Sequence, residues 1–172
     1  TPVQGIRREN GRVFVKAKDG SEEAYDKVVL ACHADESLRI LVDPSPEESR
    51  LLTPWTYSFN RTVLHTDTSF LPSQQKVWSS WNYVRSSQGE SGSPVMLTYH
   101  MNRLQNLSTK GHYCVTLNPK RSVEQGHVIR DMVYTHPIYT PESLFSQAKI
   151  NKMSGQRNTY YCGSYLGYGF HE

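Results

Sequence analysis

The chain has 172 residues, of which 37% are hydrophobic and 20% are charged, the composition of an ordinary globular protein. A net charge of +3 without a block of Lys or Arg argues against a dedicated nucleic-acid surface, and no apolar run is long enough to span a bilayer. Three widely spaced cysteines, Cys32, Cys114 and Cys162, argue against both a disulfide framework and a metal site. They predict buried free thiols in a reducing, cytoplasmic compartment.

The N-terminal region predicts a hairpin, a buried strand and a short helix. Strands are expected at residues 3–6 and 13–18, joined by an Asn-Gly turn, which is the strongest hairpin dipeptide. The continuous apolar run at residues 28–32 is typical of a strand buried on both faces. Residues 33–42 then predict a short helix with acidic residues in its first turn.

The middle of the chain predicts a β-rich domain. It follows a proline-punctuated boundary at residues 43–54, within which residues 47–52 predict a helical turn. Strands are expected at residues 57–65, 76–84, 95–102, 112–117 and 128–134. The strand at 76–84 carries aromatic residues on both faces, as in a strand that is covered on both sides or lines a cavity. We therefore expect an α+β protein with a mostly antiparallel or mixed sheet.

The last stretch begins as a strand at Thr159–Cys162 and then becomes rich in glycine, with Gly163, Gly167 and Gly169. Glycine is used where the backbone approaches a ligand closely or takes a positive φ. A strand, then glycines, then a polar edge commonly leads into a helix whose N-terminus faces an anion. The alternative is a plain loop of glycine and tyrosine that closes a sheet.

The glycine-rich run at residues 163–172 resembles the C-terminal flavin-binding signature of the FAD-dependent amine-oxidase-like superfamily, in the branch described as predicted NAD/FAD-binding proteins. The run Asp26–Asp35 resembles the same branch. Further landmarks of that branch are Leu64–Asp67, Ser80–Tyr83, Tyr99–Gln105, Thr116–Pro119 and Tyr134–Pro137. The N-terminal Gly-x-Gly-x-x-Gly loop and the end of the C-terminal motif are missing, so the resemblance is to a fragment of such a protein.

The resemblance implies FAD as the cofactor. It assigns residues 1–43 and 141–172 to an FAD-binding domain and residues 55–140 to a substrate domain. It also implies that the main chain of Val3 contacts the adenine. Beside the flavin ring and ribityl chain it would place Gly163, Gly167, Tyr168, Gly169, Phe170, His171 and Glu172. Glu172 would face a ribityl hydroxyl or cap a helix, and His171 would either bond the cofactor or pack in the loop.

The function that follows is oxidation of an amine or a lipid-like small molecule by hydride transfer to flavin. No arrangement of Ser, His and Asp or of Cys and His indicates a hydrolase. Candidates for an apolar substrate pocket are Trp81, Tyr83, Tyr99 and Met101. The alternative is that these four residues are simply part of the core. His100 alternates with Tyr99 and Met101, so it should face the opposite side of the strand. No residue is identified as catalytic.

Two other functions stay open. The first is a non-catalytic β-rich binding domain, and the second is a single-strand nucleic-acid binder that uses exposed tyrosines, which the low net charge disfavours. The flavin interpretation requires the hairpin near Val3 and the glycine-rich end to meet in space. We further expect the fragment alone neither to bind FAD tightly nor to turn over, and its exposed apolar surface to favour self-association.

Overall fold

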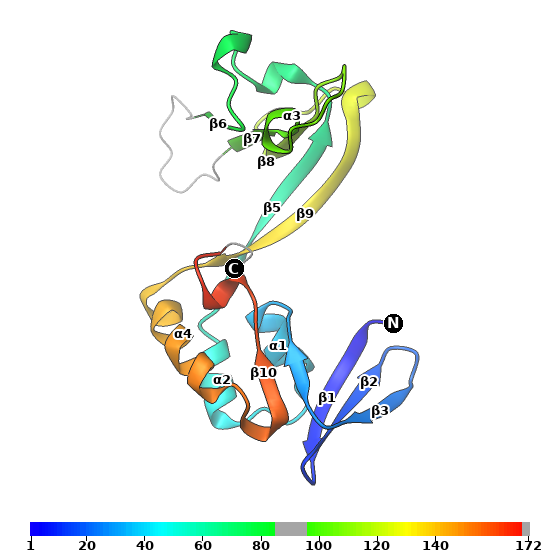
Figure 1. Cartoon of the computed structure of the whole chain (residues 1–172), viewed down its shortest axis with the longest axis vertical. Helices are drawn as coiled ribbons and strands as arrows, with labels where there is room; N and C mark the ends of the chain where they lie inside the picture. Colours follow the sequence, from blue (N-terminus) through cyan, green and yellow to red (C-terminus); the bar gives the residue numbers. More distant parts are fainter. Residues whose placement is uncertain (85–95, 170–172) are drawn as a thin grey trace. The chain divides into compact units, whose positions relative to one another are not determined.

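The computed structural model describes residues 1–84 and 96–169 and confirms the α+β class (Figure 1). The chain forms two compact units. The first comprises Thr1–Ser58 and His136–Glu172, and the second comprises Phe59–Thr135. The first unit thus contains sequence from both ends of the chain.

An antiparallel meander opens the first unit. It consists of β1 (Val3–Glu9), β2 (Arg12–Ala17) and β3 (Glu22–Tyr25). The predicted hairpin turn is confirmed, because Asn10 and Gly11 have φ values of 51° and 72°, as a type I′ turn requires.

A two-stranded parallel sheet follows, formed by β4 (Val28–Leu30) and β10 (Thr159–Tyr161). The prediction that residues 28–32 form a strand buried on both faces is wrong. The strand ends at Leu30, and Val29 is 61% exposed because it lines an open pocket.

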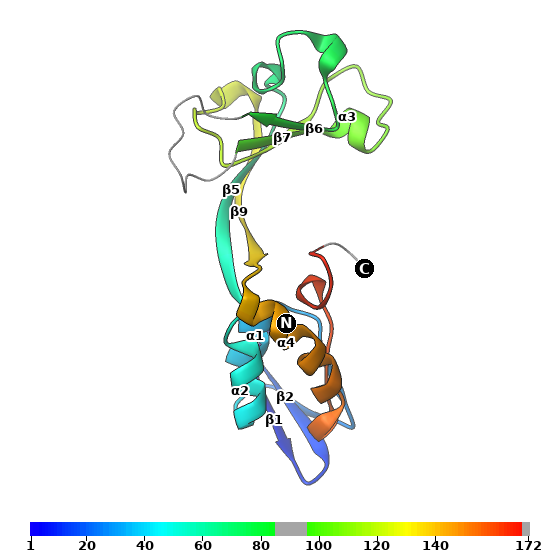
Figure 2. The same ribbon diagram turned by 90° about the vertical axis from the view of Figure 1, so that its left-hand side faces the viewer.

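Three helices cover this unit: α1 (Ala34–Ile40), α2 (Pro46–Leu52) and α4 (Pro141–Met153). Figures 1 and 2 show α2 and α4 side by side. The first two helices match the predictions, whereas α4 was not predicted. Its start nevertheless carries a clear signal, a capping box in which Thr140 accepts from the Ser143 N–H and Pro141 takes the first helical position.

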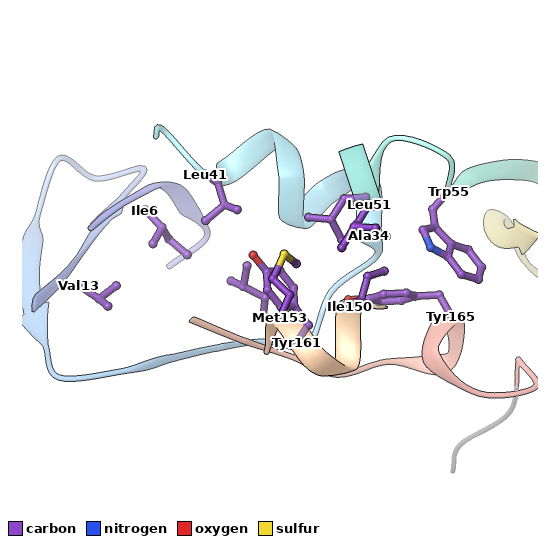
Figure 3. Close-up of a cluster of buried hydrophobic side chains, with 12 residues drawn as sticks. Ile6, Val13, Ala34, Leu41, Leu51, Trp55, Ile150, Met153, Tyr161 and Tyr165 are labelled. Atoms are coloured by element: carbon purple, nitrogen blue, oxygen red, sulfur yellow. The ribbon is translucent and has the colours of Figure 1, made fainter. Parts of the chain in front are cut away.

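The core of the first unit is shared by the hairpin, the three helices and β10. Figure 3 shows side chains of these elements pointing toward one another. The buried members are Ile6, Val13, Leu30, Ala34, Leu41, Leu51, Leu52, Trp55, Ile150, Met153, Tyr161 and Tyr165. Helix α4 and β10 contribute several of these, so the N-terminal half of the unit depends on the C-terminal segment for its core.

A buried ion pair links the hairpin, α2 and β10. Arg8 donates from Nη1 and Nη2 to the two carboxylate oxygens of Glu48, each at 2.8 Å, and the side chains are 3% and 4% exposed. Glu48 also accepts from Tyr161 Oη at 2.8 Å and from the Ser45 N–H at 2.7 Å. Every carboxylate oxygen therefore has two donors, which compensates for the cost of burying the charge.

The other sheet has five strands, in the order β6-β7-β8-β5-β9, and most of it lies in the second unit. The strands are β5 (Thr56–His65), β6 (Trp81–Val84), β7 (Met96–His100), β8 (Cys114–Leu117) and β9 (Val128–Ile138). The pairs β6–β7, β7–β8 and β5–β8 are antiparallel. The short helix α3 (Met101–Leu104) follows β7, and short 3₁₀ turns occur at Thr68–Phe70, Gln75–Val77, Gln125–His127, Gln156–Asn158 and Ser164–Leu166.

Several boundaries in this sheet differ from the predictions; β8, for example, begins at Cys114 and not at residue 112. The expected strand at 76–84 begins only at Trp81, because residues 75–77 form a 3₁₀ turn and the Trp78 indole donates to Pro72 O at 2.7 Å. Strand β7 ends at His100. Strand β9 continues through Pro137, which lacks an N–H but is tolerated because β9 is an edge strand.

Candidate functional site

The first unit brings two loops together at the carboxyl ends of its parallel strands. Strand β4 leads into Ala31 and Cys32, and β10 leads into Cys162 and Gly163. The Cys162 N–H donates to Leu30 O at 3.0 Å, which continues the pairing beyond β10. Ligands of open α/β sheets bind at this edge, so the position suits a binding site.

Two glycines of the C-terminal loop meet a conformational need. Gly163 has φ 151°, and a Cβ there would lie 2.9 Å from Tyr165 Cε1. Gly169 has φ 87°, and a Cβ there would lie 3.0 Å from the Tyr139 hydroxyl. The prediction of positive φ is confirmed at these two positions, whereas Gly167 has φ −126°.

Side chains from outside the loop fix its shape. Tyr139 Oη donates to Ser164 O at 3.0 Å, and Gln147 Nε2 donates to Tyr165 O at 2.8 Å and to Gly167 O at 2.9 Å. Sequence reasoning missed Tyr139 and Gln147, because neither belongs to the glycine-rich run. The signal that could have found Gln147 is the capping box that begins α4.

The Tyr165 ring anchors the same loop in the core. It is 1% exposed and packs edge-on against Trp55, with ring centroids 5.5 Å apart (Figure 3). Burial raises the pKa of Tyr165 well above its ordinary value, so this phenol is neutral at physiological pH. The residue therefore holds the loop in place and is not an acid or base.

A second aromatic contact orders the segment that follows β4. The His33 and Tyr57 rings stack with centroids 4.2 Å apart, and Tyr57 Oη accepts from the Ala34 N–H at 2.8 Å. Burial raises the pKa of Tyr57 to about 12. Tyr57 thus stays protonated, and it fixes the start of α1 beside the carboxyl end of β4.

An apolar pocket of about 360 Å³ adjoins this edge. Its walls come from the hairpin, from β4 with the segment after it, and from α1; the lining residues are Val3, Ile6, Val15, Val28, Val29, Leu30, Ala31, Cys32, Glu36, Arg39 and Ile40. The volume lies within the range of roughly 300–1,000 Å³ found for ligand pockets. The two charged lining residues, Glu36 and Arg39, pair with each other at 3.5 Å, and the rest of the wall is largely apolar.

The hairpin and the C-terminal segment meet within the first unit. Asn158 Nδ2 donates to Gly11 O at 2.7 Å, and Arg8 Nη1 donates to Thr159 Oγ1 at 3.0 Å. Val3 and Cys32 line the same pocket, and a Cβ on Gly163 would lie 3.8 Å from Cys32 O. The hairpin thus contacts the start of the strand that leads into the glycine loop, and Cys32 lies between the pocket and Gly163. Tyr168 is 88% exposed, while Phe170, His171 and Glu172 lie outside the described residues.

The second unit presents a partly open aromatic face on its sheet. Trp81 and Tyr83 are 54% and 59% exposed, and Trp81 packs edge-on against Tyr99 of the neighbouring strand, with centroids 5.5 Å apart. Trp81 and Tyr83 point to the same side, and Trp78 precedes the strand, so the prediction of aromatics on both faces is wrong. Met101 begins α3 and is not part of this face, because the chain leaves the strand after His100.

The opposite face of that sheet is buried, and it carries a polar cluster beside the apolar Val63 and Cys114. His65 Nε2 and Thr116 Oγ1 lie 2.8 Å apart, and Thr116 Oγ1 lies 2.9 Å from Thr98 Oγ1. Burial lowers the pKa of His65, so this imidazole is neutral and structural. His100 is 7% exposed and faces away from Tyr99, as predicted.

The three cysteines are free, but only Cys114 is fully buried. Cys32 is partly buried and Cys162 is exposed, so the prediction of buried thiols is wrong for Cys162, which lies one residue beyond β10 where the loop begins.

Within residues 1–84 and 96–169, no group of His, Cys, Asp and Glu could hold a metal ion. No helix in the described part of the chain is long and apolar enough to cross a membrane.

The fold is shared with solved structures of longer proteins. A CLA-producing fatty acid isomerase from P. acnes matches with TM-score 0.65 and 17% identity, over 98% of this chain and 43% of that one. Reduced UDP-galactopyranose mutase matches with TM-score 0.62 and 13% identity, over 98% and 41%. A putrescine oxidase with redesigned cofactor binding matches with TM-score 0.58 and 10% identity, over 98% and 43%. The chain thus spans about two fifths of the length of these structures.

The family model for flavin-containing amine oxidoreductases matches residues 1–121, which is more than half of the chain. The chain belongs to that family, and a flavin is the cofactor that membership gives to the whole protein. No curated protein sequence matches the chain. The family supports an oxidoreductase domain over a non-catalytic β-rich binding domain.

Proposed function

We propose that this chain is part of an FAD-dependent oxidoreductase that oxidises an amine or a lipid-like molecule by hydride transfer to the flavin. The observation that carries the proposal is the glycine loop at the carboxyl ends of β4 and β10, beside the pocket that contains Val3. A site at this edge suits a nucleotide-containing ligand.

The proposed cofactor contacts are those that the family resemblance implies. The main chain of Val3, at the pocket wall, would contact the adenine, and Gly163, with no Cβ to block the approach, would lie beside the flavin ring and ribityl chain. The same role is proposed for Gly167, Tyr168 and Gly169, and for Phe170, His171 and Glu172, which lie outside the described residues.

The two units carry different tasks in this proposal. The first unit, which includes residues 1–43 and 141–172, belongs to the FAD-binding domain, and the second, within residues 55–140, belongs to the substrate domain.

Free thiols in all three cysteines agree with a cytoplasmic protein. The substrate is a small molecule rather than a nucleic acid, in keeping with the low net charge.

Substrate binding is assigned to the open aromatic face of the sheet. Trp81, Tyr83 and Tyr99 offer a flat apolar surface that excludes water from a hydrocarbon or amine chain. The flavin, when bound, accepts the hydride, so the chain needs to bind and orient the substrate and needs no acid or base of its own. Tyr57 and Tyr165 stay protonated because burial raises the pKa of each phenol, which agrees with a site that supplies no acid or base.

The test is anaerobic mixing of the full-length protein with a panel of amines and a panel of unsaturated fatty acids. The proposal predicts that a member of one panel bleaches the visible band of oxidised flavin. A Trp81→Ala variant should bleach more slowly at low substrate concentration, while Lys120→Ala, an exposed change in the same unit, should not. A flavin that neither panel reduces would contradict the proposed reaction.

A further inference from the structure

The side chain of Gln147 fills a defined position on the inner side of the glycine loop. It projects from the middle of α4, and its single amide nitrogen donates both protons, to Tyr165 O at 2.8 Å and to Gly167 O at 2.9 Å. Gln147 is partly buried, so these bonds are shielded from water on one side. Of the standard neutral side chains of this length, only glutamine offers two protons on one nitrogen.

Two further carbonyls of the loop also accept hydrogen bonds. Gly163 O accepts from the Leu166 N–H at 2.9 Å. Ser164 O accepts from Tyr139 Oη at 3.0 Å and from the N–H groups of Gly167 and Gly169 at 3.3 and 3.1 Å. The Gln147 hydrogen bonds connect the loop to the body of α4, beside the core packing of Tyr165, so Gln147 helps to set where the loop sits on the helix.

The direction of these carbonyls has a structural consequence. The negative end of a peptide dipole is its carbonyl oxygen, and the N–H of the same plane points the opposite way. Anchoring Tyr165 O and Gly167 O on Gln147 therefore fixes the orientation of these two peptide groups. The Leu166 N–H of the first group donates to Gly163 O at 2.9 Å, which closes the turn of the loop, and the Tyr168 N–H of the second points away from Gln147.

We infer that Gln147 is a positioning residue for the cofactor: its amide holds the Gly163–Gly169 loop in the backbone conformation that binds FAD. This inference rests on the proposed function, since it names a residue that acts on the same site through the loop. Gln147 itself does not need to touch the cofactor.

The test uses the full-length protein, stripped of flavin and titrated with FAD, with quenching of flavin fluorescence as the readout. Gln147→Leu keeps the approximate volume but removes both donors, and it should raise the Kd for FAD by about tenfold, the effect of roughly one to two net hydrogen bonds. The matched control is Asn151→Leu, which changes an exposed amide on the same helix and should leave the Kd unchanged.

A Gln147→Glu variant separates positioning from simple packing. Its ionised carboxylate would face two carbonyl oxygens, whereas its protonated form can donate one hydrogen bond to either of them. Affinity for FAD in this variant should therefore recover as the pH is lowered, and the Gln147→Leu variant should show no such recovery. Circular dichroism of each apo-protein reports folding, and if Gln147→Leu does not fold, the pH profile of Gln147→Glu decides.

The outcomes distinguish the two levels of the argument. A wild-type protein that binds no FAD overturns the proposed function. A wild-type protein that binds FAD, together with a Gln147→Leu variant that binds as tightly as Asn151→Leu, overturns the role of Gln147 alone. A flat pH profile for Gln147→Glu relative to wild type also overturns it.

Discussion

The buried Arg8–Glu48 pair gives the sharpest prediction for stability. Replacing Glu48 with Gln keeps the side-chain volume but leaves the Arg8 guanidinium without its bidentate carboxylate, at a site where the two side chains are 3% and 4% exposed. Breaking a buried pair in this way costs about 3–5 kcal/mol. Asp43 Oδ1 still accepts from Arg8 Nε at 2.9 Å, so the lower end, about 3 kcal/mol, is expected.

The same contacts also predict a pH dependence of the stability. Burial would raise the pKa of Glu48, but hydrogen bonds from Arg8, the Ser45 N–H and Tyr161 lower it from 4.5 to about 2. Because the folded-state pKa is depressed, this stabilisation is complete above pH 4.5 and is lost as the pH falls from 4.5 to about 2. The difference corresponds to about 3 kcal/mol.

The assay is urea unfolding followed by circular dichroism, at neutral pH and at several acidic pH values. The control is Glu47→Gln on the same helix, where the carboxylate is 48% exposed and lies 3.7 Å from Arg50, so its loss should cost less than about 1 kcal/mol. The Glu48→Gln variant should also lack the acid-dependent part of the stability. Equal unfolding free energies for the two variants at neutral pH would refute the reasoning.

Three further predictions concern the proposed site and the surface. Gly163→Ala should sharply reduce the flavin content of the full-length protein, because the new Cβ would lie 2.9 Å from Tyr165 Cε1 at a φ of 151°. The control is Gly126→Ala, where a Cβ would have no atom within 4 Å and the flavin content should not change. Equal flavin absorbance in the two variants would count against this prediction. Trp81→Ala should raise KM several-fold with little change in kcat in steady-state assays, since it removes binding surface alone. The isolated 172-residue chain should self-associate through exposed apolar residues such as Val29, as measured by sizing chromatography. Val29→Asp should shift the chain toward the monomer. A monomeric wild-type chain would rule out the predicted self-association.

Local sequence signals predicted much of the fold. The Asn10-Gly11 turn and the proline-opened α2 depend on neighbouring residues only, and both formed as expected. Helix α4 had a signal of the same kind at Thr140 and Pro141 and was overlooked. The signals for these elements are local turn and capping preferences, so they can be recognised without knowledge of the distant contacts.

The remaining features depend on contacts between distant residues. The apolar run around Val29 predicts a buried side chain, but the exposed fraction of that side chain depends on which elements cover β4. The glycine-rich run predicted the need for special backbone angles, yet nothing in it indicates that a glutamine on another helix holds its carbonyls. Similarly, the alternation around Tyr99 was correct as far as His100, and the start of α3 then removed Met101 from the sheet.

The most direct test of the account is the visible absorption spectrum of the full-length protein after gentle purification, with identification of any cofactor released on denaturation. The account predicts flavin bands, release of FAD in a near-stoichiometric amount, and little or no flavin in the Gly163→Ala variant. A colourless protein that also fails to take up added FAD would contradict it.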